Sequence, residues 1–318
     1  MPRLSRRNLI SFGAAAVTLG VAPAAWAAKE GFFLSHKLPI GLQLYTLGPG
    51  LAADLDNQLS QIAKTGYKTV EMAGYLGKTP KDLRAAFDKA GLSATSSHVQ
   101  GRSGGPDPSL QDVDRLVADA HVIGIKSFVL PMFPIPAHID MTPKPGDDRR
   151  AVLARLSEQM TLDDWKATAD LLNTAGAKIQ KAGLSLGYHN HNVEFAPSAG
   201  TTGMEYLLKN TDPKLVHFEM DVGWVVAAGQ DPLALMKAHP GRFKQMHVKD
   251  VLATTKPNFV FQQDPTEIGS GMIDWKKLLP AAYAAGIRDF FVEQEPPFAK
   301  PRLESVKVSF DYLNGLMA

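Results

Sequence analysis

Short apolar runs alternate with amphipathic segments along this chain, and many of the amphipathic segments end at a glycine. The first pair is an apolar run at residues 40–45 and a helical pattern at 54–64, which Gly66 ends. Later runs typical of strands lie at 67–72, 92–98, 126–130, 184–188, 215–220, 243–248 and 289–292. Helices are predicted between and after them at 80–90, 109–123, 161–181, 204–209, 232–238, 274–285 and 303–316.

Eight strand–helix units follow one another without a break in composition. This alternation indicates a parallel sheet, and eight units predict a single closed (β/α)8 TIM barrel of the α/β class. An open doubly wound sheet is disfavoured because no glycine-rich dinucleotide fingerprint follows the first strand. Two long stretches without a pattern, 131–148 and 252–272, are predicted to be loops of the kind that carry function.

The first residues have a different character. Ser5-Arg6-Arg7-Asn8-Leu9-Ile10 precedes a Gly/Ala/Val-rich stretch and then Ala25-Trp26-Ala27, a small-x-small cleavage site. This pattern predicts a twin-arginine-type signal peptide at residues 1–27 and a barrel domain at 28–318. The protein is then expected to be periplasmic or secreted, exported by the twin-arginine machinery, with no membrane attachment after the signal is removed.

Composition narrows the possible partners. Removal of residues 1–27 takes away Arg3, Arg6 and Arg7 and no acidic residue, so the formal net charge falls from +2 to −1. A nucleic-acid footprint needs clustered basic surface, and none is indicated. The chain has no cysteine, which excludes disulfides and thiolate ligands.

Polar residues stand at the predicted carboxyl ends of several strands, where barrels of this kind hold their chemistry. A single strand-end Asp or His is more often a helix cap, but six such ends at one mouth favour a functional site. These residues are Glu71, His98, His189 with His191, Asp221, His247 and Glu293.

Asp221, His247 and Glu293 provide two carboxylates and an imidazole, spaced by 26 and 46 residues. Such ligands favour Mn²⁺, Mg²⁺, Co²⁺ or Zn²⁺ over metals that prefer soft ligands. Lys249, two residues past His247, either neutralises a substrate anion or forms a rim salt bridge with Asp250. Trp224 offers a surface for a sugar ring or simply packs. His98 and Glu71 are further candidates for substrate binding.

Several phrases together resemble the sugar phosphate isomerase/epimerase family of the xylose isomerase-like barrels. They are residues 184–195, 221–224, 228–232, 247–250, 268–271 and 292–293. The resemblance covers residues 38–316 and implies a divalent metal held by Glu, Asp, His and Glu from strands five to eight. Asp221, His247 and Glu293 match the last three positions, whereas His189 stands where many members have the first Glu.

That substitution leaves His189, His191 and Glu194 as alternatives for the strand-five ligand or base. We expect Glu293, His189 and His191 to carry the acid–base chemistry, and Asp221, His247, Glu293 and His189 to hold the metal.

Three functions fit these residues. The first is a metal-dependent sugar isomerase or epimerase that removes a proton next to a metal-bound carbonyl and forms an enediolate. The second is a lyase that expels the aglycone of a 3-keto-glycoside by β-elimination. The third is a non-catalytic periplasmic sugar-binding protein. A fourth, endonuclease activity, is disfavoured because the near-neutral mature charge offers no phosphate-tracking surface.

Overall fold

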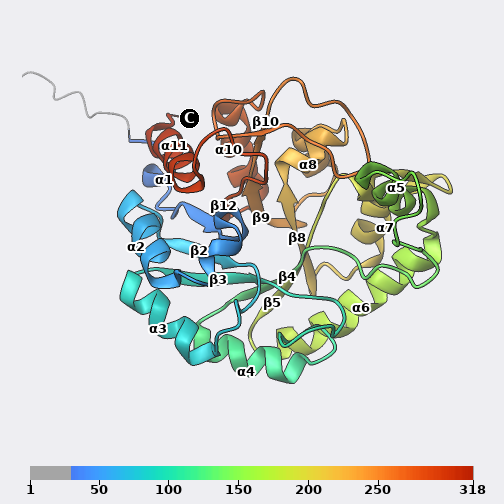
Figure 1. Ribbon diagram of the computed structural model, residues 1–318, viewed down its shortest axis with the longest axis horizontal. Coiled ribbons are helices and arrows are strands. Elements are labelled where there is room, and N and C mark those ends of the chain that lie inside the picture. Colours follow the sequence, from blue (N-terminus) through green and yellow to red (C-terminus); the bar gives the residue numbers. More distant parts are fainter. Residues whose placement is uncertain (1–29, 318) are drawn as a thin grey trace, which may run out of the picture.

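A computed structural model describes residues 30–317 and shows a closed barrel of eight parallel strands inside a ring of helices (Figure 1). Around the barrel the order is β1-β12-β9-β8-β5-β4-β3-β2. The strands are β1 (Gly41–Gln43), β2 (Thr69–Met72), β3 (Ser93–His98), β4 (Ser127–Leu130), β5 (Ser185–His189), β8 (Val216–Asp221), β9 (Phe243–Val248) and β12 (Asp289–Val292). The predicted (β/α)8 fold is confirmed. The predicted signal peptide lies outside the described residues.

The outer helices follow the strands in sequence. They are α2 (Leu55–Thr65), α3 (Pro80–Ala90), α4 (Val113–Ile123), α6 (Leu162–Lys181), α7 (Gly203–Asn210), α9 (Pro232–Ala238), α10 (Trp275–Ala285) and α11 (Arg302–Gly315). Local signals define their ends: Thr79 caps α3 by accepting from Asp82 N, and Gly91 ends it in the left-handed conformation. Within residues 30–317, no helix has both the length and the apolar character needed to cross a membrane.

Several elements differ from the predicted ones. Helix α4 begins at Val113 rather than at residue 109, because Asp112 caps it. Residues 131–148 contain no helix or strand, as predicted, but the helix that follows them was not predicted. The loop 252–272 contains one short strand that pairs with the end of the preceding segment. The additional elements are α1 (Phe32–Ser35), α5 (Arg149–Gln159), α8 (Val222–Ala227), β10 (Asp250–Val251), β11 (Pro265–Thr266), the hairpin β6 (Pro197–Ser198) and β7 (Thr201–Thr202), and the 3-10 turns η1 (Leu44–Leu47), η2 (Pro49–Leu51) and η3 (Val193–Phe195).

The inside of the barrel is polar, although branched apolar residues usually fill such barrels. One hydrogen-bonded chain crosses it: His217 Nε2 donates to Gln245 Oε1 at 2.7 Å, and Gln245 Nε2 donates to Ser96 Oγ at 3.0 Å. Ser96 Oγ in turn donates to Glu71 Oε1 at 2.6 Å. The apolar core therefore lies mainly between the sheet and the helices, and the barrel interior is available for ionisable side chains.

Candidate active site

Asp221, His247 and Glu293 meet at the carboxyl end of the barrel. Asp221 ends β8 and pairs in register with His247 of β9, while Glu293 directly follows β12. One ligand atom from each lies within 4.8 Å of the others, and all three side chains are buried. His247 Nδ1 is 3.0 Å from Glu293 Oε2 and 3.8 Å from Asp221 Oδ2. The three predicted residues therefore form one compact group of possible metal ligands, which we call the metal-type group.

The two oxygens of Asp221 have different surroundings. Oδ1 caps the short helix α8 by accepting from Trp224 N at 3.0 Å. Oδ2 is buried and pairs with Lys249 Nζ at 2.7 Å. Asp221 is thus a helix cap and a candidate ligand at once, and the cap fixes the direction of the second oxygen.

Lys249 is fully buried beside this group. Its Nζ lies 2.7 Å from Asp221 Oδ2, 2.6 Å from Glu293 Oε2 and 2.7 Å from Glu295 Oε1. The rim salt bridge with Asp250 is wrong, because the Asp250 carboxylate instead accepts from backbone amides and the Trp275 indole. Glu295 was not among the predicted site residues.

The three candidates at the end of strand five, His189, His191 and Glu194, lie in different surroundings. His189 ends β5, with Nδ1 3.0 Å from Glu219 Oε2 and Nε2 3.7 Å from Asp221 Oδ2. Glu194 turns away and accepts from the Tyr188 hydroxyl at 2.7 Å. Of the predicted alternatives, only the His189 imidazole reaches the carboxylates of the metal-type group.

His191 lies between that group and an aromatic wall. Its ring centroid is 5.5 Å from that of Trp224, 5.1 Å from that of Phe261 and 4.9 Å from that of His189. Its Nδ1 is buried without a hydrogen-bond partner among the described residues. The Trp224 ring lies over Lys249 Nζ, 5.1 Å from the centroid, and its Nε1 donates to Glu295. Trp224 therefore both packs and lines the site.

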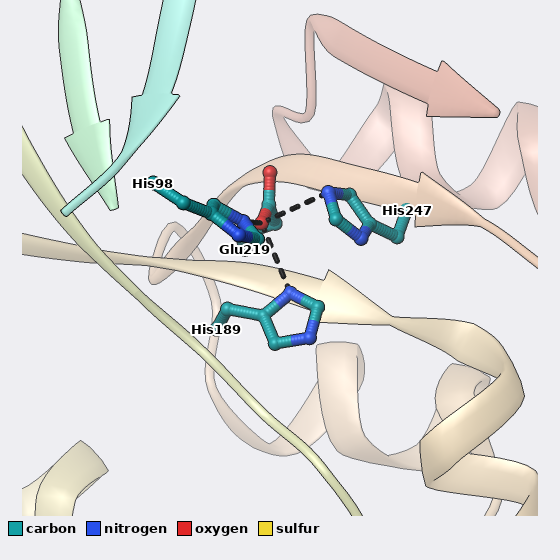
Figure 2. Close-up of side chains that lie close together, drawn as sticks. All are labelled: His98, His189, Glu219 and His247. Carbon is teal, nitrogen blue, oxygen red and sulfur yellow. Dashed lines mark hydrogen bonds and ion pairs between the residues drawn. The ribbon is translucent and has the colours of Figure 1, made fainter. Parts of the chain in front are cut away.

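A second, deeper group lies below the first. His98, His189 and His247 converge on Glu219 from three different strands (Figure 2). Glu71 belongs to the same layer: it is fully buried and accepts from His247 Nε2 at 2.6 Å, so it orients His247 rather than standing open to a substrate. His98 Nε2 is 3.2 Å from both Glu71 and Glu219. Glu219 was not predicted, although it lies two residues before Asp221 and so on the same face of β8.

The charges of the site follow from this crowding. Burial works to lower the pKa of His247, but Glu219 and Glu293 outweigh it and raise that pKa. Burial would raise the pKa of Glu293, but Lys249 and His247 hold it well below its usual value. Burial, with neighbouring cationic groups, lowers the pKa of His189 and takes that of His191 to about 3. Both strand-five imidazoles are therefore neutral at physiological pH.

A cavity of about 630 Å³ opens beside this group. Its walls include Tyr45, Arg149, Arg150 and Phe261, while Trp224 and Glu295 form the part nearest the metal-type group. Both of the latter contact Lys249, so the ammonium group lies between the cavity and the buried carboxylates. Residues of the long loop 252–272 and of the start of α5 line this cavity at the barrel mouth.

The donor set fits a divalent cation. Oxygen and imidazole ligands suit Mn²⁺, Mg²⁺, Co²⁺ or Zn²⁺, and the two carboxylates and one imidazole of this group offer ligand atoms that all lie within 4.8 Å of one another. Asp221, His247 and Glu293 would hold the cation, with His189 next to them.

Together these features define a closed (β/α)8 barrel whose ionisable side chains gather at the carboxyl ends of its strands. Residues 59–315 match the family model of the xylose isomerase-like TIM barrel, and the chain belongs to that family. It is 26% identical over 237 residues to an inosose dehydratase of Geobacillus kaustophilus (strain HTA426), covering 73% of this chain and 69% of the relative. An inosose dehydratase of Lacticaseibacillus casei is 24% identical over 323 residues, covering 95% and 97% of the two chains.

A crystal structure of a sugar phosphate isomerase/epimerase from Parabacteroides distasonis ATCC 8503 is also similar. The sequence identity is 29%, the TM-score is 0.66, and the match covers 94% of this chain and 98% of the other. The chain thus shares its family with proteins that are named as enzymes acting on inososes and sugar phosphates.

Proposed function

We propose that this protein is a divalent-metal-dependent enzyme that removes a proton from the carbon next to a carbonyl group of a sugar. The observation that carries the proposal is the group of Asp221, His247 and Glu293, which three neighbouring strands bring within 4.8 Å. A divalent cation bound there would supply Lewis-acid polarisation of substrate oxygens. Loss of a proton beside a carbonyl begins both epimerisation and β-elimination, so either product is compatible with this site.

Side chains around the metal-type group can supply charge neutralisation and proton transfer. Lys249 Nζ is a buried positive charge next to Asp221, and it can neutralise an oxyanion that forms on a substrate bound there. His189 directs one nitrogen to Glu219 and the other to Asp221, which leaves His191 and Glu293 for proton transfer. His191 Nδ1 is buried without a hydrogen-bond partner among the described residues, and Glu293 Oε2 lies between His247 and Lys249, so these two groups are the candidates for proton transfer.

Replacement of Asp221 or His247 by Ala tests this assignment. Each variant should lose bound metal and at least about 100-fold in activity, since several kcal/mol of transition-state stabilisation would be removed. Metal content is measured by elemental analysis and activity by product formation from ketoses and keto-glycosides. His239→Ala is the control, because His239 pairs with Glu205 outside the barrel and should keep both properties. A metal-free Asp221→Ala protein with full activity would contradict the proposal.

The second candidate is elimination from a 3-keto-glycoside. A volume of about 630 Å³ lies within the range of sites that hold ligands larger than one sugar ring, which leaves room for an aglycone. The relatives named as dehydratases also remove a group rather than invert a centre. Release of the aglycone from a chromogenic keto-glycoside distinguishes this reaction from interconversion of free ketoses.

A further inference from the structure

The carboxylate of Glu219 is the meeting point of three histidines. Its Oε2 lies 3.0 Å from His189 Nδ1, 3.2 Å from His98 Nε2 and 3.2 Å from His247 Nε2 (Figure 2). Glu219 itself has no exposed surface. A carboxylate in such a place is expensive to bury unless its neighbours use its charge, so its task lies in those contacts.

Two of these histidines each direct one ring nitrogen to a deeper carboxylate, Glu219 or Glu71, and the other to an upper carboxylate, Asp221 or Glu293. His189 turns Nδ1 down to Glu219 and Nε2 up to Asp221 Oδ2, 3.7 Å away. His247 turns Nε2 down to Glu71 at 2.6 Å and Nδ1 up to Glu293 at 3.0 Å. A histidine binds a metal as the neutral ring, in which one nitrogen carries the hydrogen and the other the lone pair. With a cation bound, a carboxylate below each ring would hold the hydrogen there and leave the lone pair facing Asp221 and Glu293.

We propose that Glu219 is a positioning residue that makes His189 the fourth ligand of the metal through Nε2. The inference rests on the proposed function, because it assumes that Asp221, His247 and Glu293 bind the cation. Glu71 performs the same task for His247. His98, 3.2 Å from both carboxylates, bridges them and keeps the two in place.

The arrangement also explains how a histidine can stand at the strand-five position. Many family members are expected to have a glutamate ligand at this position. A neutral His189 in its place removes one negative charge from the set of metal ligands. Glu219, paired in register with His189 across β5 and β8, places a carboxyl group directly below the ring, where it can hold the hydrogen on Nδ1. His189 and Glu219 then act as a unit in place of a single carboxylate.

Metal affinity of purified variants tests this assignment. Glu219→Gln should bind Mn²⁺ or Co²⁺ about 10- to 100-fold more weakly than the wild type, the usual effect of losing such a partner. Affinity is measured by competition with a chromophoric chelator, and stoichiometry by elemental analysis. The Co²⁺ absorption spectrum should also shift, because the orientation of one ligand changes.

Matched variants separate this effect from loss of folding. Glu267→Gln removes another buried carboxylate, one that accepts from Ser305 rather than from a histidine, and should leave affinity unchanged. His189→Glu combined with Glu219→Gln should restore affinity to within a few-fold of the wild type, since it returns the negative charge to the set of metal ligands. A purely structural role for Glu219 does not predict this rescue.

Each other outcome overturns the inference. One metal per wild-type chain with unchanged affinity in Glu219→Gln would contradict the positioning role alone. Two metals per chain, one of them lost in Glu219→Gln, would show that the deep histidines form a second metal site instead. A wild-type chain that binds no divalent cation would overturn both this inference and the proposed function.

Discussion

Single residues at the barrel mouth serve two neighbours at once, and Asp221 shows this most plainly. One of its oxygens caps α8 and the other faces the metal-type group. The capping role and the ligand role are usually weighed as alternatives for a strand-end Asp, yet here the same side chain caps a helix with one oxygen and can offer the other to a metal. Sequence can predict such a residue because both roles place it at the end of a strand, directly before the next helix.

The deeper residues were harder to predict. Asp221, His247 and Glu293 could be found because each ends a β-prone run. Glu219 lies inside its strand, where barrel interiors are usually apolar, and only the alternation His217, Glu219, Asp221 on one face of β8 hints at it. Its partners come from β3, β5 and β9, and that convergence depends on the closed barrel rather than on any local pattern.

His217 gives a prediction about pH. Burial lowers the pKa of this side chain to about 4 from its ordinary value near 6.5. The folded protein therefore disfavours the protonated ring, and the free energy of unfolding should fall as pH drops from 6.5 through 4. His217→Gln lacks this titration and can still donate to Gln245. Between pH 7 and pH 4 the wild type should lose about 3 kcal/mol more than this variant.

Urea denaturation of both proteins, with chelator present in every sample, measures this difference. Parallel pH profiles for the wild type and His217→Gln would show that the ring titrates normally in the folded state.

At the scale of elements, hydrophobic periodicity predicted the helices that have one clearly apolar face and missed those that do not. Helix α5 buries only Arg155 and Leu156, so its sequence carries no apolar stripe. Helix α8 is six residues long and almost wholly buried, and a short apolar run of that kind does not reveal its period. Both helices border the candidate active site, which is where local rules are most often overridden by tertiary contacts.

Strand β5 depends on a glycine for its place in the barrel. A Cβ added at Gly187 would lie 2.6 Å from His217 Nε2, on a ring already held by Gln245. Gly187→Ala should therefore destabilise the protein by about 1–3 kcal/mol. It should also weaken metal binding, because His189 lies two residues further along the same face.

Thermal unfolding and chelator competition measure the two effects. Gly104→Ala is the control: its added Cβ meets no atom within 4 Å, and the change should stay within about 0.5 kcal/mol. Wild-type stability in Gly187→Ala would mean that the strand can shift to accept the methyl group.

For the whole molecule, the count of eight strand–helix units was sufficient to predict a closed barrel, since parallel strands with short connections leave few other arrangements. The polar network that fills the barrel could not be predicted, because it links residues far apart in sequence through contacts that exist only after closure. Export through the twin-arginine route stays a prediction. It concerns residues 1–27, outside the structure, and N-terminal sequencing of the protein from a periplasmic extract tests it.

Proton exchange at the substrate tests the proposed chemistry most directly. Metal-loaded protein is incubated in D₂O with a panel of ketoses and 3-keto-glycosides, and deuterium at each carbon is followed by NMR. We predict incorporation at the carbon next to the carbonyl of at least one substrate, abolished by chelator and by Asp221→Ala. Tight sugar binding without deuterium at any carbon would contradict the proposal and favour a non-catalytic sugar-binding protein.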